Sequence, residues 1–189
     1  CRVIELPGGP QLPAGHSLAS LGAEVIKVEP PGGDPARLLP PLAGDADSPI
    51  GLFWAGYSGG KRSVTADLST AEGRDLVARL AAEADVVIES YPPGVLASWR
   101  LGYSDLANRN PRLILASITP FGQTGPYASW KGSDLVHFAM GGYLYMTGNK
   151  DGTPIKPSAP YQSWLFGSIH LVSAILLTLR QRKRTGRGA

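Results

Sequence analysis

Short runs of almost wholly apolar residues, separated by helix-like segments, constrain the fold of this chain more than any other feature. Residues 85–89 and 113–118 carry few polar side chains in their centres, which is typical of parallel strands covered on both faces. The first 30 residues add a strand at 3–6, a helix at 13–21 and a strand at 24–29. Strands that alternate with helices predict an α/β fold, namely a Rossmann-like parallel sheet wrapped by helices.

The rest of the chain predicts further elements within the same unit, and we treat residues 1–189 as one domain. Ser69 and Glu72 form a Ser-x-x-Glu capping box, which predicts a helix that starts at Ser69 and ends near residue 84. The proline- and glycine-rich residues 30–50 predict a loop. The other expected elements are a short helix at 52–57, a strand at 63–65, helical turns at 93–99 and 104–109, a helical segment at 133–140 and a long final helix from 162 to about 183.

Composition and charge exclude several classes of protein. A single cysteine, Cys1, excludes a disulfide framework and a cysteine-based zinc site, and it favours a cytoplasmic location. The three histidines have no ligand spacing, so we expect no metal and ordinary packing or surface roles for His16, His137 and His170.

The basic charge is concentrated at the end of the chain, which argues against a nucleic-acid partner. Without the five basic residues among the last ten, the formal net charge of +3 becomes −2. The longest apolar run, residues 164–179, is shorter than the ~20 residues of a membrane-spanning helix, so we expect a buried core helix and no membrane partner.

An open α/β sheet binds its ligand beyond the carboxyl ends of its strands. The candidate loops are therefore 7–13, 30–37, 90–94 and 119–132, most of them rich in glycine and proline. Such composition lets a backbone approach a ligand closely, although it also suits simple tight turns. The usual dinucleotide fingerprint and the Walker A loop are both absent.

Several sequence blocks resemble class III CoA-transferases, the CaiB/BaiF family, and they occur in family order. The blocks are Leu21–Glu29, Pro31–Arg37, Lys61–Val64 with Asp67–Leu68, Asp85–Glu89 with Pro93–Leu96, Leu101–Tyr103, Asn110–Ile114, Gly122–Tyr127 and Arg184–Gly188. The resemblance implies a Rossmann-like large domain, of which this chain is the N-terminal part, with the small domain outside it. It also implies an interlocked dimer and transfer of CoA from an acyl-CoA to a carboxylic acid through an aspartate nucleophile.

The resemblance places Ser163 where relatives carry that aspartate, because Pro160, Tyr161 and Gly167 match the surrounding pattern. A serine needs a nearby base, and His170 would lie roughly 10 Å away along a helix. Ser163 would then be a helix-start residue or cap, and a second domain or subunit would supply the carboxylate.

Two alternatives stay open beside this interpretation. One is a non-catalytic CoA-binding or scaffold half of a tandem protein. The other is an enzyme similar to 2-methylacyl-CoA racemases, although the histidine and aspartate of that branch fall at Ser133 and Ser163.

The resemblance also indicates where CoA binds. Pro30 and Ser98 stand where many members have arginine, whereas Lys131 matches a CoA-contacting lysine. The candidate CoA-binding residues are Arg37, Lys61, Arg62, Ser90, Tyr91, Pro92, Arg100 and Lys131.

Overall fold

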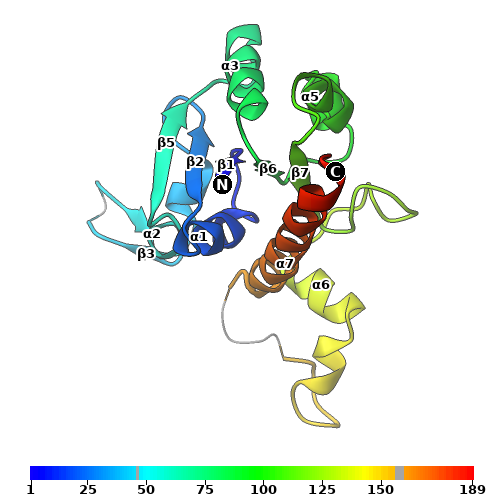
Figure 1. The fold of residues 1–189 in the computed structure, drawn as a ribbon. Helices are drawn as coiled ribbons and strands as arrows, with labels where there is room; N and C mark the ends of the chain where they lie inside the picture. Colours follow the sequence, from blue (N-terminus) through cyan, green and yellow to red (C-terminus); the bar gives the residue numbers. More distant parts are fainter. Residues whose placement is uncertain (46, 156–159) are drawn as a thin grey trace.

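The computed structural model describes residues 1–45, 47–155 and 160–189 and contains a five-stranded parallel sheet (Figure 1). The strand order is β5-β2-β1-β6-β7, and each neighbouring pair is parallel. The strands are β1 (Arg2–Glu5), β2 (Glu24–Glu29), β5 (Lys61–Thr65), β6 (Val86–Glu89) and β7 (Ile114–Ser117). The expected parallel α/β sheet is therefore confirmed.

Helices connect the strands, and most lie close to the predicted ranges. The helices are α1 (Leu12–Ser20), α2 (Leu52–Tyr57), α3 (Ala71–Ala82), α4 (Val95–Ser98), α5 (Tyr103–Arg109), α6 (Asp134–Met140) and α7 (Gln162–Thr185), with 3-10 turns η1 (Pro35–Leu38) and η2 (Tyr143–Met146). The segment 30–50, expected to be a loop, also contains η1 and a small antiparallel pair, β3 (Leu42–Ala43) and β4 (Ile50–Gly51).

The central strands β1, β2 and β6 are largely buried, and alternate residues of each strand point to opposite faces of the sheet. On one face, Ile4 and Val87 belong to a core that includes residues of α3 and α5. On the other face, Val3 and Ile88 pack with residues of α1 and α7. Figure 1 shows these two pairs of helices on opposite sides of the strands. This arrangement explains why the centres of β1, β6 and β7 are apolar.

Helix α3 begins one residue later than the predicted capping box. The hydroxyl of Thr70 accepts the N–H of Gly73 at 3.0 Å, so Thr70 is the cap. The Ser69 hydroxyl instead donates to Asp67 at 2.7 Å. A side chain at residue 73 would collide with the Asp67 carbonyl, so the glycine lets the helix start against this turn.

Helix α7 differs from the expected buried core helix because much of it is exposed. Val172 and Ile175 fix one side to the sheet, and Arg182 pairs with Asp85 at 2.6 Å. Only 17% of its most apolar stretch is buried, and by length and composition alone this helix could cross a membrane. The core helix of a soluble protein passes the same test, so the finding is weak.

Candidate functional site

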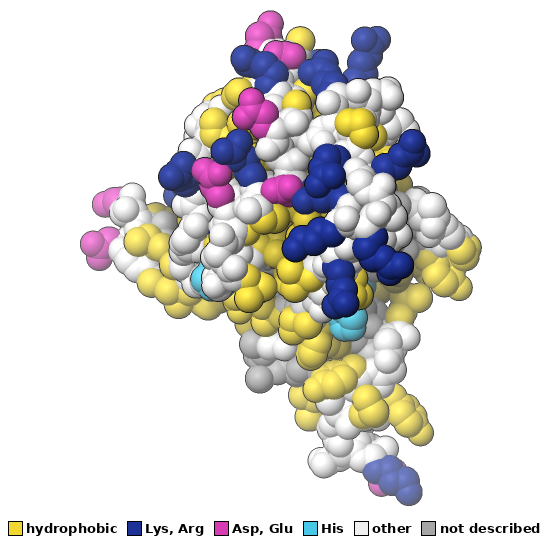
Figure 2. Space-filling view, viewed as in Figure 1, with side chains coloured by type: hydrophobic (Ala, Val, Ile, Leu, Met, Phe, Trp, Pro, Cys, Tyr) yellow, Lys and Arg dark blue, Asp and Glu magenta, His cyan; other side chains and the backbone are white. Residues whose placement is uncertain are grey.

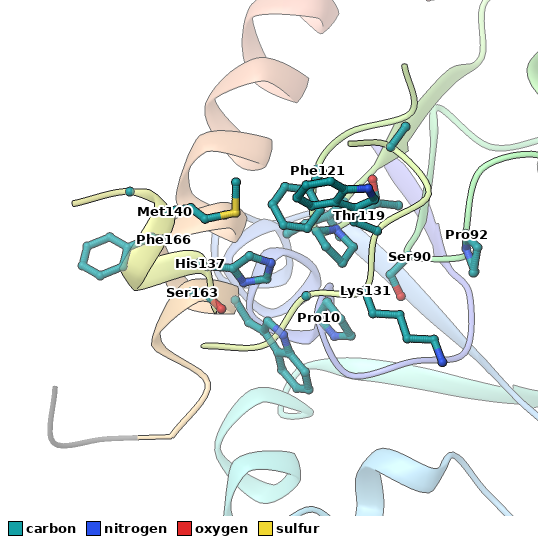
Figure 3. Close-up of a pocket in the computed structure, with 18 of the residues that line it drawn as sticks. Pro10, Ser90, Pro92, Thr119, Phe121, Lys131, His137, Met140, Ser163 and Phe166 are labelled. Atoms are coloured by element: carbon teal, nitrogen blue, oxygen red, sulfur yellow. The ribbon is translucent and has the colours of Figure 1, made fainter. Parts of the chain in front are cut away.

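A cavity of about 1070 Å³ opens at the carboxyl ends of the strands. Its walls come from the loops after β1, β6 and β7, represented by Pro10, Ser90 and Thr119, and from helices α6 and α7 (Figure 3). This is the edge at which open parallel sheets bind ligands. The loops predicted to surround a ligand therefore include those that line the cavity.

The cavity wall is largely apolar and holds few ionisable side chains. Phe121 and Trp130 line it, and Trp130 packs against Tyr127 with ring centroids 4.4 Å apart. Among the residues that the structure describes, the lining contains no carboxylate, and its ionisable groups are Lys131 and His137. Such a site favours an apolar or negatively charged ligand.

Ser163 lies in this wall as the second residue of α7, and its neighbour is a carboxylate from α6. The Ser163 hydroxyl donates to Asp134 at 2.5 Å, and the N–H groups of Gln162 and Ser163 donate to the same carboxylate at 3.1 and 3.0 Å. The expectation of a helix-start residue is correct. Of the two roles expected, helix start or cap, the structure shows the first, because Tyr161 occupies the cap position. The Asp134 carboxylate accepts the free N–H groups at the positive end of α7.

The histidines occupy different environments. His170 is exposed on α7 with Nδ1 2.8 Å from the Phe166 carbonyl, whereas His137 lines the cavity with its ring 5.7 Å from that of Phe121. Burial lowers the pKa of His137, and the nearby Asp134 opposes that effect. No ligand-spacing pattern marks His137 in the sequence, because the other residues of the cavity wall come from other elements. No group of three potential metal ligands occurs in the described ranges.

The cavity brings together Ser90, Pro92, Lys131 and Ser163 from the predicted site residues. Tyr91 lines an adjacent cavity of about 320 Å³, and burial raises the pKa of its phenol. The carboxylate of Glu89 accepts the N–H of Tyr91 at 2.6 Å and holds this turn. Burial raises the pKa of Glu89.

Arg37 is bound to the body of the protein and does not line the cavity. Its guanidinium donates to both carboxylate oxygens of Glu29 at 2.6 and 2.8 Å and lies 4.5 Å from the centre of the Trp54 ring. Arg37, the Ser63 hydroxyl and the Asp34 N–H lower the pKa of Glu29 to about 2. The geometry therefore assigns Arg37 a structural ion pair.

The other predicted basic residues also lie away from the cavity lining. Lys61 is 3% exposed and lies 2.7 Å from a Glu5 oxygen, with its pKa lowered by burial and raised by Glu5. Arg62 is exposed and pairs with Glu24 at 3.0 Å. Arg100 is exposed in a left-handed backbone conformation. The structure does not bring these three cations to the cavity.

A buried charge cluster, which the sequence analysis missed, holds the loop after β1. Lys27 lies 3.2 Å from Glu5 and 2.9 Å from Asp34, and it donates to the carbonyls of Leu6 and Gly8. Asp34 also accepts the N–H of Gly8 at 2.8 Å. Because Gly8 belongs to the loop that supplies walls of both cavities, the cluster fixes the shape of the site.

Comparisons with known proteins agree with this arrangement. The chain is 45% identical to a succinate–glutarate CoA-transferase of Agrobacterium fabrum, covering 99% of this chain and 48% of the relative. It is 42% identical to the succinyl-CoA–L-malate CoA-transferase beta subunit of Chloroflexus aurantiacus, covering 90% of this chain and 42% of that protein. The chain thus spans slightly less than half the length of these relatives.

A solved structure and a family model complete the comparison. A CAIB/BAIF family protein from Brucella suis superposes with a TM-score of 0.92 at 43% identity, covering all of this chain and 50% of that one. The model of CoA-transferase family III matches residues 2–189. The resemblance carried by the sequence blocks is thereby confirmed, and the chain belongs to CoA-transferase family III.

Proposed function

We propose that residues 1–189 form the acyl-CoA-binding, large-domain part of an enzyme that transfers CoA between an acyl-CoA thioester and a carboxylic acid. The cavity at the carboxyl edge of the sheet, with Ser163 in its wall, is the single observation that carries this proposal. The alignment of the sequence blocks places Ser163 at the position where relatives carry the catalytic aspartate. The cavity beside Ser163 is therefore the proposed reaction centre.

The residues around Ser163 do not supply the nucleophile of this reaction. A carboxylate would attack the thioester carbonyl and release CoA, but no carboxylate lines the described part of the cavity. The Ser163 hydroxyl donates to Asp134, and that carboxylate is a weak base for an alcohol. We therefore assign the attacking carboxylate to a second CoA-transferase domain or subunit.

The exposed side of α7 supports the presence of such a partner. Ile169 and Leu177 are 61% and 69% exposed on this helix. In Figure 2 hydrophobic side chains cover much of the lower half of this view, whereas most Lys and Arg side chains lie above them. A large exposed apolar area of this kind marks an interaction surface. The Chloroflexus relative is itself named as one subunit of a transferase.

Lys131 is the proposed contact for the phosphates of CoA. Its ammonium group lies at one side of the cavity, on the same side of the view as Ser90 and Pro92 (Figure 3). A lysine binds phosphate oxygens through charge-assisted hydrogen bonds. The names of the relatives mention succinate, glutarate and malate, and we take short dicarboxylic acids as the substrate class.

A titration of CoA into the full-length protein by calorimetry tests the binding site. Lys131→Ala should weaken CoA about tenfold or more, the loss expected for one charged hydrogen bond. Arg100→Ala is the matched control, because Arg100 is a cation outside the cavity, and it should leave CoA affinity unchanged. Equal effects of the two substitutions, or no binding of CoA, would contradict the proposed site.

Activity is tested with succinyl-CoA as donor and glutarate as acceptor, with the partner subunit or domain present. Formation of glutaryl-CoA, followed by chromatography, is the expected result. Binding of CoA without any transfer would favour the scaffold interpretation instead.

A further inference from the structure

Two exposed aromatic side chains lie against each other in the loop after β7. Trp130 lines the cavity and is 52% exposed, and Tyr127 is 45% exposed. Their ring centroids are 4.4 Å apart, and the rings are tilted by 42°. Tryptophan side chains bury most of their surface on average, so an accessible pair of rings beside a cavity indicates a contact for a ligand or a partner.

The local backbone holds the two rings in place. The N–H of Trp130 donates to the Tyr127 carbonyl at 2.9 Å, and a turn of this kind brings residues three apart in the sequence close together. Phe121 supports both rings from one side, with its centroid 6.1 Å from that of Trp130 and 6.3 Å from that of Tyr127. The indole is therefore packed against two neighbours, and it still has surface that a ligand can contact.

The cation beside this pair indicates what kind of ligand the rings would meet. Lys131 directly follows Trp130, and both residues line the same cavity. Consecutive Cα atoms are only about 3.8 Å apart. In CoA a single ribose joins the phosphates to adenine, which is a flat, neutral aromatic base. A phosphate bound by Lys131 would therefore leave the adenine within reach of the Trp130 indole.

We propose that Trp130, supported by Tyr127, is the stacking platform for the adenine base of CoA. This inference rests on the proposed function and adds the residue that recognises the nucleotide end of the substrate. Stacking of a base requires an accessible aromatic face, and the exposed indole supplies one. A stacked adenine would also remove from water part of the apolar surface that Trp130 and Tyr127 now expose.

Two ligands that differ in the nucleotide test the platform in the full-length protein, with calorimetry as the measurement. CoA contains the adenosine part, whereas phosphopantetheine has the same arm and a phosphate but no adenosine. We expect Trp130→Ala to weaken CoA about tenfold, which is within the range of one stacked base, and to leave the affinity for phosphopantetheine unchanged. Lys131→Ala should weaken both ligands, since each carries a phosphate.

Further variants separate stacking from a structural role. Trp130→Phe retains an aromatic face and should retain most of the CoA affinity, whereas Trp130→Leu retains only apolar surface and should lose as much as Trp130→Ala. Tyr127→Ala should cause a smaller loss that is again confined to CoA. Tyr145→Ala is the control, because Tyr145 is an exposed aromatic residue that lines neither cavity, and it should behave as the wild type.

Three results would overturn the platform while leaving the proposed function intact. They are an unchanged CoA affinity in Trp130→Ala, an equal loss for CoA and phosphopantetheine in that variant, and a CoA affinity in Trp130→Leu equal to that of the wild type. Analytical ultracentrifugation of Trp130→Ala covers the other meaning of an exposed pair, since lost assembly with unchanged CoA affinity would identify a protein contact instead. Failure of CoA to bind the wild type would overturn the proposed function as well.

Discussion

Replacing Ser163 by aspartate should place two carboxylates against each other, since the Ser163 oxygen already lies 2.5 Å from Asp134. Two unit charges about 4 Å apart repel by about 4 kcal/mol at an effective dielectric constant near 20. The pair relieves this repulsion by retaining one proton, which raises the pKa of one member in the folded state. Ser163→Asp would therefore restore the carboxyl group that relatives carry at this position. That carboxyl group would form a pair with Asp134 that is either protonated or destabilised.

The consequence for stability has a definite sign. A carboxyl group whose folded pKa is raised binds more protons in the folded than in the unfolded state, so the free energy of unfolding falls as the pH rises above about 4. Urea unfolding at pH 5 and pH 8 should show this loss in Ser163→Asp. Ser163→Asn, which retains a donor for Asp134, is the control, and adding Asp134→Asn to Ser163→Asp should remove most of the pH dependence. Parallel pH profiles for Ser163→Asp and Ser163→Asn would refute this reasoning.

Two further substitutions test the charges beneath the site. Lys27→Met should lower the free energy of unfolding by about 3–5 kcal/mol, because it leaves the fully buried Glu5 and its neighbours short of a cation. Arg37→Met should lower it by about 1–2 kcal/mol at pH 7, since the Arg37 side chain is half exposed and its pair is partly screened. The pKa of Glu29 is lowered to about 2, so the stability from this pair is lost as the pH falls from about 4.5 to about 2, and Arg37→Met should flatten the profile there.

Urea unfolding provides the measurement for both variants, with Arg62→Met as the surface control. Arg62 is exposed and pairs with a partly exposed Glu24, so its loss should change stability by less than about 1 kcal/mol. A loss below about 1 kcal/mol in Lys27→Met would contradict the structural role of the cluster. An unchanged acid profile in Arg37→Met would contradict the assignment for Glu29.

The layered fold was predictable because its determinants are local. The centre of β6, residues 86–88, is three apolar residues in a row, and this alone indicates a strand covered on both faces. The positions of the charged residues within the strands were not predictable in the same way. Charged side chains such as Glu5 and Lys27 are normally exposed to solvent. Both are buried here because they neutralise each other on neighbouring parallel strands. Only the pairing of β1 with β2 could reveal this.

The site was predictable in position but not in its partners. The register placed Ser163 at the start of a helix, and the structure finds it there, in the cavity wall. Its contact with Asp134 joins residues from two helices, and no local pattern encodes that distance. The basic candidates Arg37 and Lys61 failed to reach the cavity for the same reason, because the carboxylates that hold them lie on other strands.

Helix α7 is one continuous rod of 24 residues with Ser163 and Gly167 on the cavity and Ile169 and Leu177 on its outer side. A rigid helix moves as one body. A subunit that binds the outer side of α7 and displaces the helix would therefore also change the shape of the cavity. Binding of the partner subunit and binding of a ligand in the cavity then become thermodynamically linked. Each binding event must change the affinity of the other by the same factor. Dissociation of the proposed partner subunit should therefore depend on the acyl-CoA concentration.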